Sequence, residues 1–520
     1  MSKNTQREFH TGGKLALLNI AVGLGTFMQV LDTSIANVAV PYIAGNLSVS
    51  AEQGTWVITS FAASNAIVLP LTGWLSDYFG RVRLFVWSVL LFSLTSFLCG
   101  LSTSLTMLVI LRVIQGAVAG SLIPLSQSLI VSCNPPEKQG TALGFWGMIV
   151  IVAPILGPII GGYLTYEYSW PWIFYINVPI GIFSAVTTWN LLKDHESKIV
   201  RNPIDWVGLF FLSLGVACLQ IMLDKGKDLD WFESNLIITL TVASVISLIY
   251  FGIWNSFQKY PIIDFSFFKN RNFAVGTFGV TVGYLLYFTS AVTVPLWLQT
   301  EQNYTAFWAG IAIAPVGIVP FCFSTTVGNN MHRFDLRVII ALSFFLFAVS
   351  FFYQANFTTA VSLHQIMFSR FLQGFGVALF FLPLVQLSLA EVPKERYASA
   401  SGLFNFARIL IVSGFGTSLS IQIWTHLEIF HHARLSETST AFRHVTTQFY
   451  NQLSQLSSRI PFTPGVINRV LDRQIEQQAF MLSTNDIAWL AAWMFIGMIP
   501  LIFLAKRVKA SRKAVASSAH

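Results

Sequence analysis

Two related stretches, "LRVIQGAVAGSLIPLSQSL" (111–129) and "SRFLQGFGVALFFLPLVQLSL" (369–389), decide the fold of this chain. Both contain an arginine, a glutamine and a glycine in the same order within a long apolar run, and the second copy follows the first by 258 residues. The dipeptide Val-Pro at 40–41 recurs at 294–295, at nearly the same offset. Arginine is rare inside an apolar helix, so chance recurrence is the weaker explanation. The chain therefore consists of two related halves.

The composition places these halves in a membrane. Of 520 residues, 54% are hydrophobic and only 10% are charged, whereas soluble proteins carry about 25% charged residues. A membrane-spanning helix needs roughly 20 apolar residues, and we predict fourteen such spans. They are 15–40, 53–75, 84–101, 105–132, 141–165, 170–192, 205–223, 235–256, 272–299, 306–327, 337–354, 361–390, 397–424 and 486–505.

Basic residues orient the predicted spans. Most of the 31 lysines and arginines fall on one side of the membrane, in segments such as "GRVR" (80–83), "FFKNRN" (267–272) and the tail "KRVKASRK" (506–513). The positive-inside rule makes that side, and both termini, cytoplasmic. The net charge of +8 then indicates contact with anionic lipid, not with nucleic acid.

This topology divides the chain into five parts. We predict a cytoplasmic N-terminus (1–14), a first six-helix half (15–202), two inserted helices (203–258), a second six-helix half (259–505) and a basic cytoplasmic tail (506–520). Duplicated six-helix halves, with a site between them near the membrane midplane, are typical of secondary transporters.

The loop between the second and third spans, "GWLSDYFGRVR" (73–83), combines small and charged residues. Gly73 and Gly80 permit close helix approach and a tight turn. Asp77 can pair with Arg81 or reach the end of a neighbouring helix. The alternative is an ordinary solvated loop.

The fifth span contains "APILGPIIGGYL" (153–164). Gly157 with Gly161, and Pro158 with Gly162, are spaced by one helical turn and predict a flat, bendable face. Small residues let membrane helices approach closely, and proline loosens the backbone. Ordinary helix packing would also explain this pattern.

Together, these motifs resemble the signatures of the major facilitator superfamily, in which the first is a conformational latch and the second is the antiporter motif of drug:proton exporters. Tyr78, Val82 and Ala153 depart from the usual family residues. Further stretches, such as "LDTSIANVAVP" (31–41) and "WPWIFYINVPIGI" (170–182), resemble the fourteen-span EmrB-type branch. The resemblance implies an all-α fold of two six-helix bundles with two inserted helices. It also implies a bacterial inner-membrane exporter of hydrophobic compounds, which works with a periplasmic adaptor of the EmrA type and a TolC-like outer-membrane channel.

Four ionisable side chains lie well inside predicted helices, namely Asp32, Arg112, Arg370 and Arg408. Such groups are costly in hydrocarbon and commonly mark functional sites. Burial disfavours an ionised carboxyl and a nearby arginine favours it, so a conformational change could make Asp32 take up and release a proton. The resemblance also links an acid in this helix to proton coupling. The alternative is a static ion pair.

Arg112 is the predicted partner of Asp32, with snorkelling to the membrane surface as the alternative. Arg370 is its counterpart in the second half, where no acid is evident at the position of Asp32, so we expect it to be structural. Arg408 could face an anionic group of the cargo. The residues predicted to line the substrate cavity are Gln29, Thr33, Asn37, Gln115, Glu301 and Arg408.

The long outer loop, 425–485, is predicted to form a helical hairpin on the periplasmic face, where an adaptor could dock. Its histidines (His426, His431 and His432) lack an accompanying array of cysteines or carboxylates, so we expect no metal site there.

The sequence favours transport over catalysis. It contains no phosphate-binding G-x-x-x-x-G-K-[ST] motif, so the expected driving force is a proton gradient, without a cofactor. One buried acid against three arginines favours neutral or weakly acidic amphipathic cargo over dications. The remaining alternatives are an exporter of one endogenous metabolite or siderophore, an importer, and a non-transporting membrane receptor or scaffold.

Overall fold

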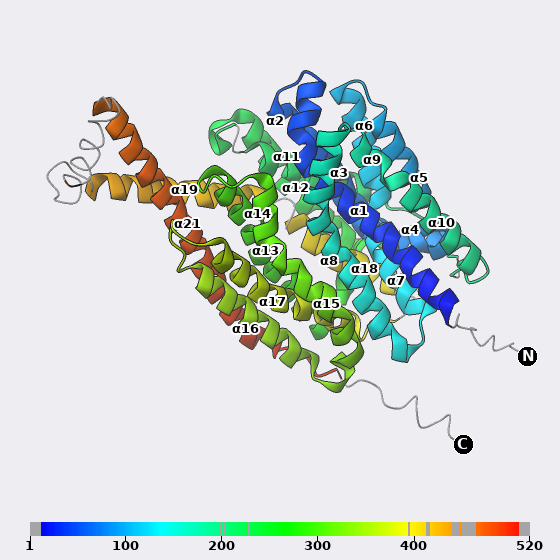
Figure 1. The fold of residues 1–520 in the computed structure, drawn as a ribbon. Helices are drawn as coiled ribbons and strands as arrows, with labels where there is room; N and C mark the ends of the chain where they lie inside the picture. The colour runs from blue at the N-terminus through cyan, green and yellow to red at the C-terminus, as the bar shows by residue number, and fades with distance from the viewer. Residues whose placement is uncertain are drawn as a thin grey trace, which may run out of the picture.

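The computed structural model describes residues 12–197, 199–200, 203–226, 229–393, 396–411, 416–438, 448 and 464–508. All regular structure in these residues is helical, as the sequence predicts. The helices form one elongated bundle, and both chain ends leave it at the same end (Figure 1). We call this end the terminal end and the opposite end the distal end.

The described part of the predicted first half consists of long helical segments, and several of these segments are broken into two helices. The breaks lie at Pro70, at Gly120 and at Ile176. Its elements are α1 (Gly13–Asn46), α2 (Ala51–Gly54), α3 (Trp56–Val68), η1 (Leu69–Leu71), α4 (Thr72–Phe79), α5 (Arg81–Gly100), α6 (Leu105–Ala119), α7 (Leu122–Cys133), α8 (Pro136–Glu167), α9 (Trp172–Tyr175) and α10 (Asn177–Leu192).

Two helices, α11 (Trp206–Lys225) and α12 (Asn235–Phe257), follow the first half and pack against each other, with α11 also touching α3. Short turns η2 (Trp231–Glu233) and η3 (Phe265–Lys269) flank α12. The second half then comprises α13 (Arg271–Thr300), α14 (Ala306–Ile313), α15 (Pro315–Asn330), η4 (Met331–Arg333), α16 (Leu336–Gln354), α17 (Leu363–Leu389), α18 (Tyr397–Leu410), α19 (Thr417–Thr438) and α21 (Pro464–Ile502).

Helices cover most of the described part of every predicted span. Among the described residues, eleven helical segments are long and apolar enough to cross a membrane. The other three predicted spans fall on α8, on α14 with α15, and on α18 with α19. The chain is therefore a multi-pass membrane protein, while the count of fourteen crossings stays a prediction.

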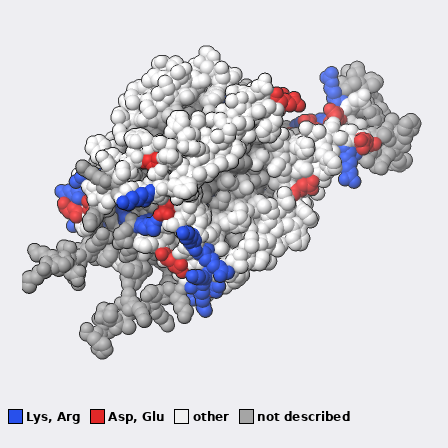
Figure 2. Space-filling model, turned by 180° about the vertical axis from the view of Figure 1, so that it is seen from behind, with Lys and Arg blue, Asp and Glu red and all other residues white. Residues whose placement is uncertain are grey.

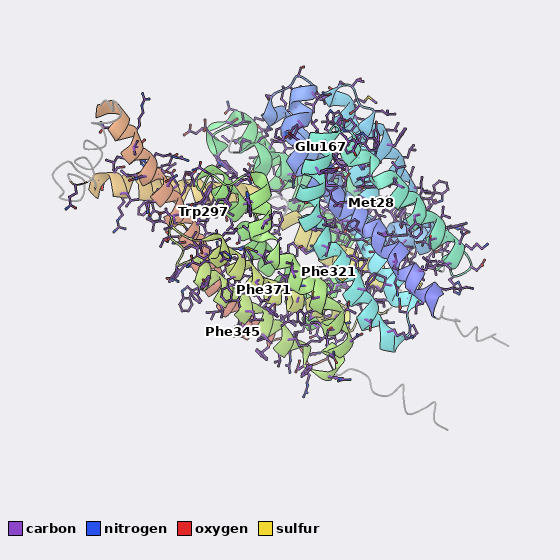
Figure 3. The ribbon with its side chains drawn as sticks, viewed as in Figure 1. Met28, Glu167, Trp297, Phe321, Phe345 and Phe371 are labelled. Carbon is purple, nitrogen blue, oxygen red and sulfur yellow. The ribbon has the colours of Figure 1, made fainter. Side chains whose placement is uncertain are left out.

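The outer surface of the bundle is apolar. Phe345 and Phe371 are 53% and 42% exposed, whereas Met28 and Trp297 are fully buried (Figure 3). On the face in Figure 2, lysines and arginines gather at the terminal end and on the projecting helices, and a wide uncharged band separates them. Such a band is the surface that a bilayer core requires.

The helices α19 and α21 run together past the rest of the bundle at its distal end (Figure 1). Two histidines join them, because His431 lies 2.7 Å from Asp486 and His432 lies 3.3 Å from Asp472. The described parts of the predicted hairpin are thus paired helices, and its residues 439–447 and 449–463 lie outside the described residues.

Candidate functional site

The centre of the first half holds a buried ion pair between α1 and α6. Nη1 of Arg112 lies 2.5 Å from Oδ2 of Asp32, and their side chains are 0% and 1% exposed. Asn177 of α10 donates to the other carboxylate oxygen, Oδ1, at 2.9 Å. Both oxygens of the acid therefore accept hydrogen bonds, as a buried carboxylate requires.

Three further groups fix the position of the Arg112 guanidinium. Its Nε donates to the carbonyl oxygen of Val57 at 2.9 Å, and its Nη1 donates to Oε1 of Gln115 at 2.8 Å. The ring of Phe61 lies 4.2 Å from its central carbon, which is a cation–π contact. Arg112 therefore points into the bundle, which excludes snorkelling to the membrane surface.

The structure brings together Asp32, Arg112 and Gln115 and adds Asn177, which the sequence did not single out. This amide also donates to Oγ of Ser96 at 3.0 Å, and so ties α10 to α5 beside the acid. The available signal was a single asparagine inside the apolar stretch 170–182.

The second half repeats this arrangement without the acid. Arg370 donates from Nη1 to Ser290 at 2.7 Å and to Gln373 at 2.8 Å, and it also bonds Gln354. Ser290 stands 258 residues after Asp32, at the offset that relates the two arginines. A neutral hydroxyl thus replaces the carboxylate, and Arg370 has no acidic partner among the described residues.

The predicted cavity residues of α1 differ in their exposure. Gln29 is buried, and its Oε1 has no partner within the described part of the chain. Thr33 is half-buried and donates to the carbonyl of Gln29 at 3.1 Å, while Asn37 is exposed. This polar stripe therefore runs from beside Asp32 toward the distal end of α1.

The structure places Glu301 and Arg408 away from the Asp32 pair. Glu301 follows α13 at the distal end, where Oε2 lies 3.3 Å from Arg473 of α21. Burial raises the pKa of Glu301 above its ordinary value, and Arg473 opposes that shift.

Arg408 lies on α18, where its guanidinium carbon is 4.8 Å from the ring of Tyr284 and 5.2 Å from that of Phe381. It is 6% exposed, and its Nε has no partner among the described residues. Phe381 also stacks on Trp146 of the first half, with centroids 6.1 Å apart. Arg408 is thus a buried cation beside a contact between the two halves.

The halves meet closely at the terminal end, where α8 crosses α15. A Cβ atom on Gly144 would lie 2.8 Å from the carbonyl oxygen of Ser324, and one on Gly140 would lie 2.6 Å from that of Gly328. Thr141 and Asn329 are hydrogen-bonded beside this crossing. Glycine is required there because the two backbones touch.

Gly73, one of the predicted latch residues, also lies at a contact between the halves. Gly73 on α4 packs so closely against Ser399, at the start of α18, that a side chain would overlap with it. Gly80 has φ +90°, and Oε1 of Glu196 accepts the Val82 amide at 3.0 Å beside it.

Asp77 accepts the Val200 amide at its backbone oxygen, at 2.8 Å, and the Arg81 amide donates to Ser197 at 3.1 Å. The segment after α10 therefore covers this loop, which the sequence did not indicate.

The predicted antiporter motif lies where α8 packs against α1. Cβ atoms on Gly157 and Gly161 would crowd Ser34 and Ile35, which are close neighbours of Asp32 along α1. Gly162 has open space around it, and Pro158 lies within the same helix. One face of the motif, rather than both, therefore makes the close contact.

Known proteins are similar in sequence to this chain along most of its length. A sequence model of the Major Facilitator Superfamily matches residues 22–417. Multidrug export proteins EmrB of Haemophilus influenzae and of Escherichia coli K12 are each 46% identical over 496 residues, which cover 95% of this chain and 96% of each relative. Fatty acid resistance protein FarB of Neisseria gonorrhoeae is 44% identical, covering 95% of this chain and 97% of FarB.

Solved structures share the fold at low sequence identity. The human organic anion transporter MFSD10 has a TM-score of 0.54 and 12% identity, covering 93% of this chain and 100% of its own. A bacterial homologue of the human lysosomal transporter Spinster has a TM-score of 0.52 and 14% identity, covering 95% of this chain and 98% of its own.

Proposed function

The chain belongs to the Major Facilitator Superfamily, and on this basis we propose that it is a proton-coupled efflux transporter of hydrophobic and amphipathic toxic compounds. The family is one of transporters, not of enzymes. The 46% identity with multidrug export proteins along almost the whole chain supports export of several compounds. We place it in a bacterial inner membrane with fourteen spans and both termini in the cytoplasm.

The observation that carries proton coupling is the Asp32–Arg112 pair. A fully buried carboxylate is held by an arginine at 2.5 Å and by the Asn177 amide at 2.9 Å. A proton on Asp32 would remove its charge and release Arg112 from the ion pair. Because burial favours the neutral acid and the arginine favours the ionised one, small movements of α1 relative to α6 would decide when the proton is bound.

The helix α8 can transmit such a movement to the contact between the halves. It packs against α1 through Gly157 and Gly161, and against α15 through Gly140 and Gly144. Both contacts lie on one 32-residue helix. We infer that protonation of Asp32 shifts α1 and α8 together and opens the terminal end to cargo. The described conformation, with its terminal end closed, is then the outward-facing state.

Arg408 supports a preference for neutral and weakly acidic cargo. Two buried arginines of the second half, Arg370 and Arg408, have no acidic partner among the described residues. An anionic group on the cargo would balance Arg408, whereas a dication would be repelled. The name of the FarB relative, a fatty acid resistance protein, favours the narrower alternative of one class of acidic cargo.

We also propose that the hairpin of α19 and α21 docks a periplasmic adaptor of the EmrA type, which connects to a TolC-like channel. The paired helices project from the distal end, away from the apolar band. Deletion of 436–480 should abolish recovery of the adaptor in a pull-down while transport by the isolated protein remains. Full recovery of the adaptor would refute this assignment.

Dye efflux in everted membrane vesicles tests the proposal. An imposed pH gradient should drive transport by the wild type and fail to drive it in Asp32→Asn. Arg408→Gln should keep transport of a neutral dye and weaken competition by a weakly acidic uncoupler. Lack of efflux of any compound by the wild type would instead favour a receptor or scaffold.

A further inference from the structure

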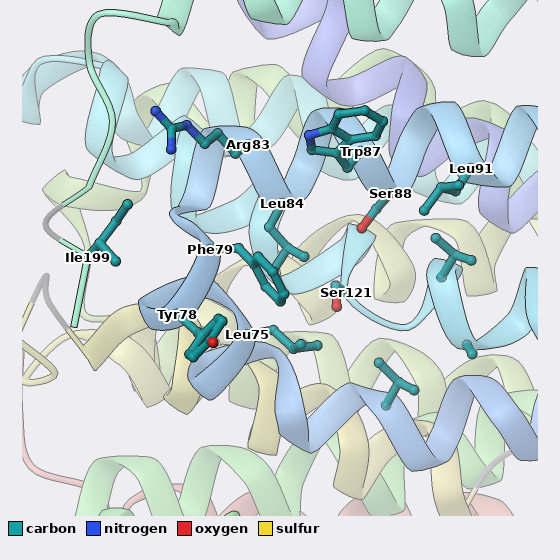
Figure 4. A pocket seen from close by; sticks show the side chains of 13 residues that line it. Leu75, Tyr78, Phe79, Arg83, Leu84, Trp87, Ser88, Leu91, Ser121 and Ile199 are labelled. Carbon is teal, nitrogen blue, oxygen red and sulfur yellow. The ribbon is translucent and has the colours of Figure 1, made fainter. Parts of the chain in front are cut away.

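A groove on the outer side of the first half lies between α4, α5 and the junction of α6 with α7 (Figure 4). Its volume is about 530 Å³, which is within the range of small-molecule pockets. Its lining residues all come from the first half and the segment that follows α10. They are Val68, Leu75, Tyr78, Phe79, Arg83, Leu84, Trp87, Ser88, Leu91, Ala117, Val118, Ser121 and Ile199.

The groove opens toward the lipid-facing surface. Trp87, Phe79 and Leu91 on its rim are 61%, 48% and 42% exposed. Its walls are largely aliphatic, so they suit a hydrocarbon chain. Since none of its lining residues belongs to the second half, cargo that moves between the two halves does not pass through it.

Two largely buried serines line the groove. Ser88 and Ser121 are 4% and 2% exposed, and neither side chain forms a hydrogen bond with the described residues. Ser93 and Ser126, by contrast, donate to carbonyls of their own helices at 2.9 and 2.8 Å. In Figure 4 both Ser88 and Ser121 lie along the groove. Neither hydroxyl oxygen is fully enclosed by protein, so both face the groove that they line and can donate to a ligand with acceptor oxygens.

A positive charge marks one end of the groove. Arg83 is exposed near the start of α5, and its guanidinium has no ion-pair partner among the described residues. The nearby carboxylate of Glu196 accepts the backbone amides of Val82 and Arg83, at 3.0 and 2.9 Å. Ser88 lies five residues further along α5, or about 7.5 Å at the helical rise.

We propose that this groove binds an anionic phospholipid. The phosphate would bind Arg83, the ester carbonyls would accept hydrogen bonds from Ser88 and Ser121, and one acyl chain would follow the aliphatic wall. A lipid is the fitting occupant because the groove opens outward and its charged end lies at the terminal end, where basic residues gather (Figure 2). Basic groups at the cytoplasmic surface attract anionic lipid.

The site has a consequence for the contact between the halves. Leu75 and Tyr78 of α4 line the groove, while Gly73 of the same short helix packs against Ser399 of α18. A lipid in the groove contacts α4 and holds it against α18, so the lipid favours closure of the terminal end. This effect does not depend on proton coupling or on the nature of the cargo.

Native mass spectrometry of the full-length protein, titrated with phosphatidylglycerol or phosphatidylcholine, tests the site. We expect one retained phosphatidylglycerol, with at least a fivefold loss of retention in Arg83→Gln and a smaller loss in Ser88→Ala/Ser121→Ala. Arg333→Gln, which removes another exposed arginine, is the control and should retain the lipid like the wild type.

Three results would overturn the proposal: equal retention in Arg83→Gln and wild type, an equal loss in Arg333→Gln, or equal binding of phosphatidylcholine. A photoreactive residue in place of Leu91 separates lipid from cargo. Cross-linking to phosphatidylglycerol supports the site, whereas exclusive cross-linking to a weakly acidic uncoupler makes it a cargo site and refutes the lipid assignment.

Discussion

Replacement of Gly144 by alanine should open the terminal end without harming the helix that carries it. The added Cβ would lie 2.8 Å from the carbonyl oxygen of Ser324 and 3.3 Å from Cα of Thr325, both backbone atoms of the opposite half. Overpacking of this kind costs roughly 1–3 kcal/mol, and the cost applies only while α8 and α15 touch. The ratio of open to closed molecules should therefore rise by about 5-fold to 150-fold.

Gly147, one turn further along α8, provides the matched control. A Cβ there meets nothing within 4 Å. In both variants, alanine stabilises the helix α8 by about 1 kcal/mol relative to glycine. Spin labels on Lys193→Cys and Arg333→Cys, with the four native cysteines replaced, report the separation of the halves by double electron–electron resonance. An unchanged distance distribution in Gly144→Ala, or an equal shift in Gly147→Ala, would refute the role assigned to this crossing.

Further predictions concern the buried arginines and the start of α16. Arg112→Ala leaves Asp32 buried without its partner and should cost about 3–5 kcal/mol of unfolding free energy; a loss below 1 kcal/mol in denaturant titration would contradict this. Ser290→Asp places an acid beside Arg370 and should fold with a raised melting temperature. Ser343→Asp, at a buried serine that donates to the Gly376 carbonyl, should misfold. Asp335 accepts the Arg337 guanidinium at 2.8 Å, which lowers the pKa of this acid below its ordinary 3.8. Its contribution to stability is therefore complete above that value and is lost as the pH falls through the lowered pKa. Asp335 is also the N-cap of α16, where its side chain accepts the backbone amide of Arg337 at 3.0 Å. Asp335→Ala should therefore speed amide exchange in the first turn of α16 at pH 7, reflecting a loss of about 1 kcal/mol, and have no effect at pH below the lowered pKa.

The ion pair was predictable from the sequence for a clear physical reason. A charge within an apolar helix must find a partner, and the first half offers Asp32 one such arginine, Arg112. The repeat offset also identifies Ser290 as the neutral counterpart of Asp32. The helical spans were equally accessible, because long apolar runs leave the backbone no other way to satisfy its hydrogen bonds in lipid.

Other parts of the site leave no pattern in the sequence. The Val57 carbonyl that binds Arg112 is a backbone group, and Asn177 is one neutral amide in an apolar run. Glycine motifs indicate that a helix is closely packed, but they do not identify its partner. The packing of Gly144 against Ser324 and the contact of Glu196 with Gly80 could therefore be identified only from the three-dimensional structure.

The central claim is that Asp32 carries the proton that drives export. Proteoliposomes containing the full-length protein test it most directly, by comparing gradient-driven transport with cargo exchange at equal pH on both sides. Asp32→Asn should abolish accumulation driven by the pH gradient and retain exchange of labelled for unlabelled cargo, because exchange needs cargo binding without net proton movement. Gradient-driven accumulation at the wild-type rate in Asp32→Asn would contradict the account.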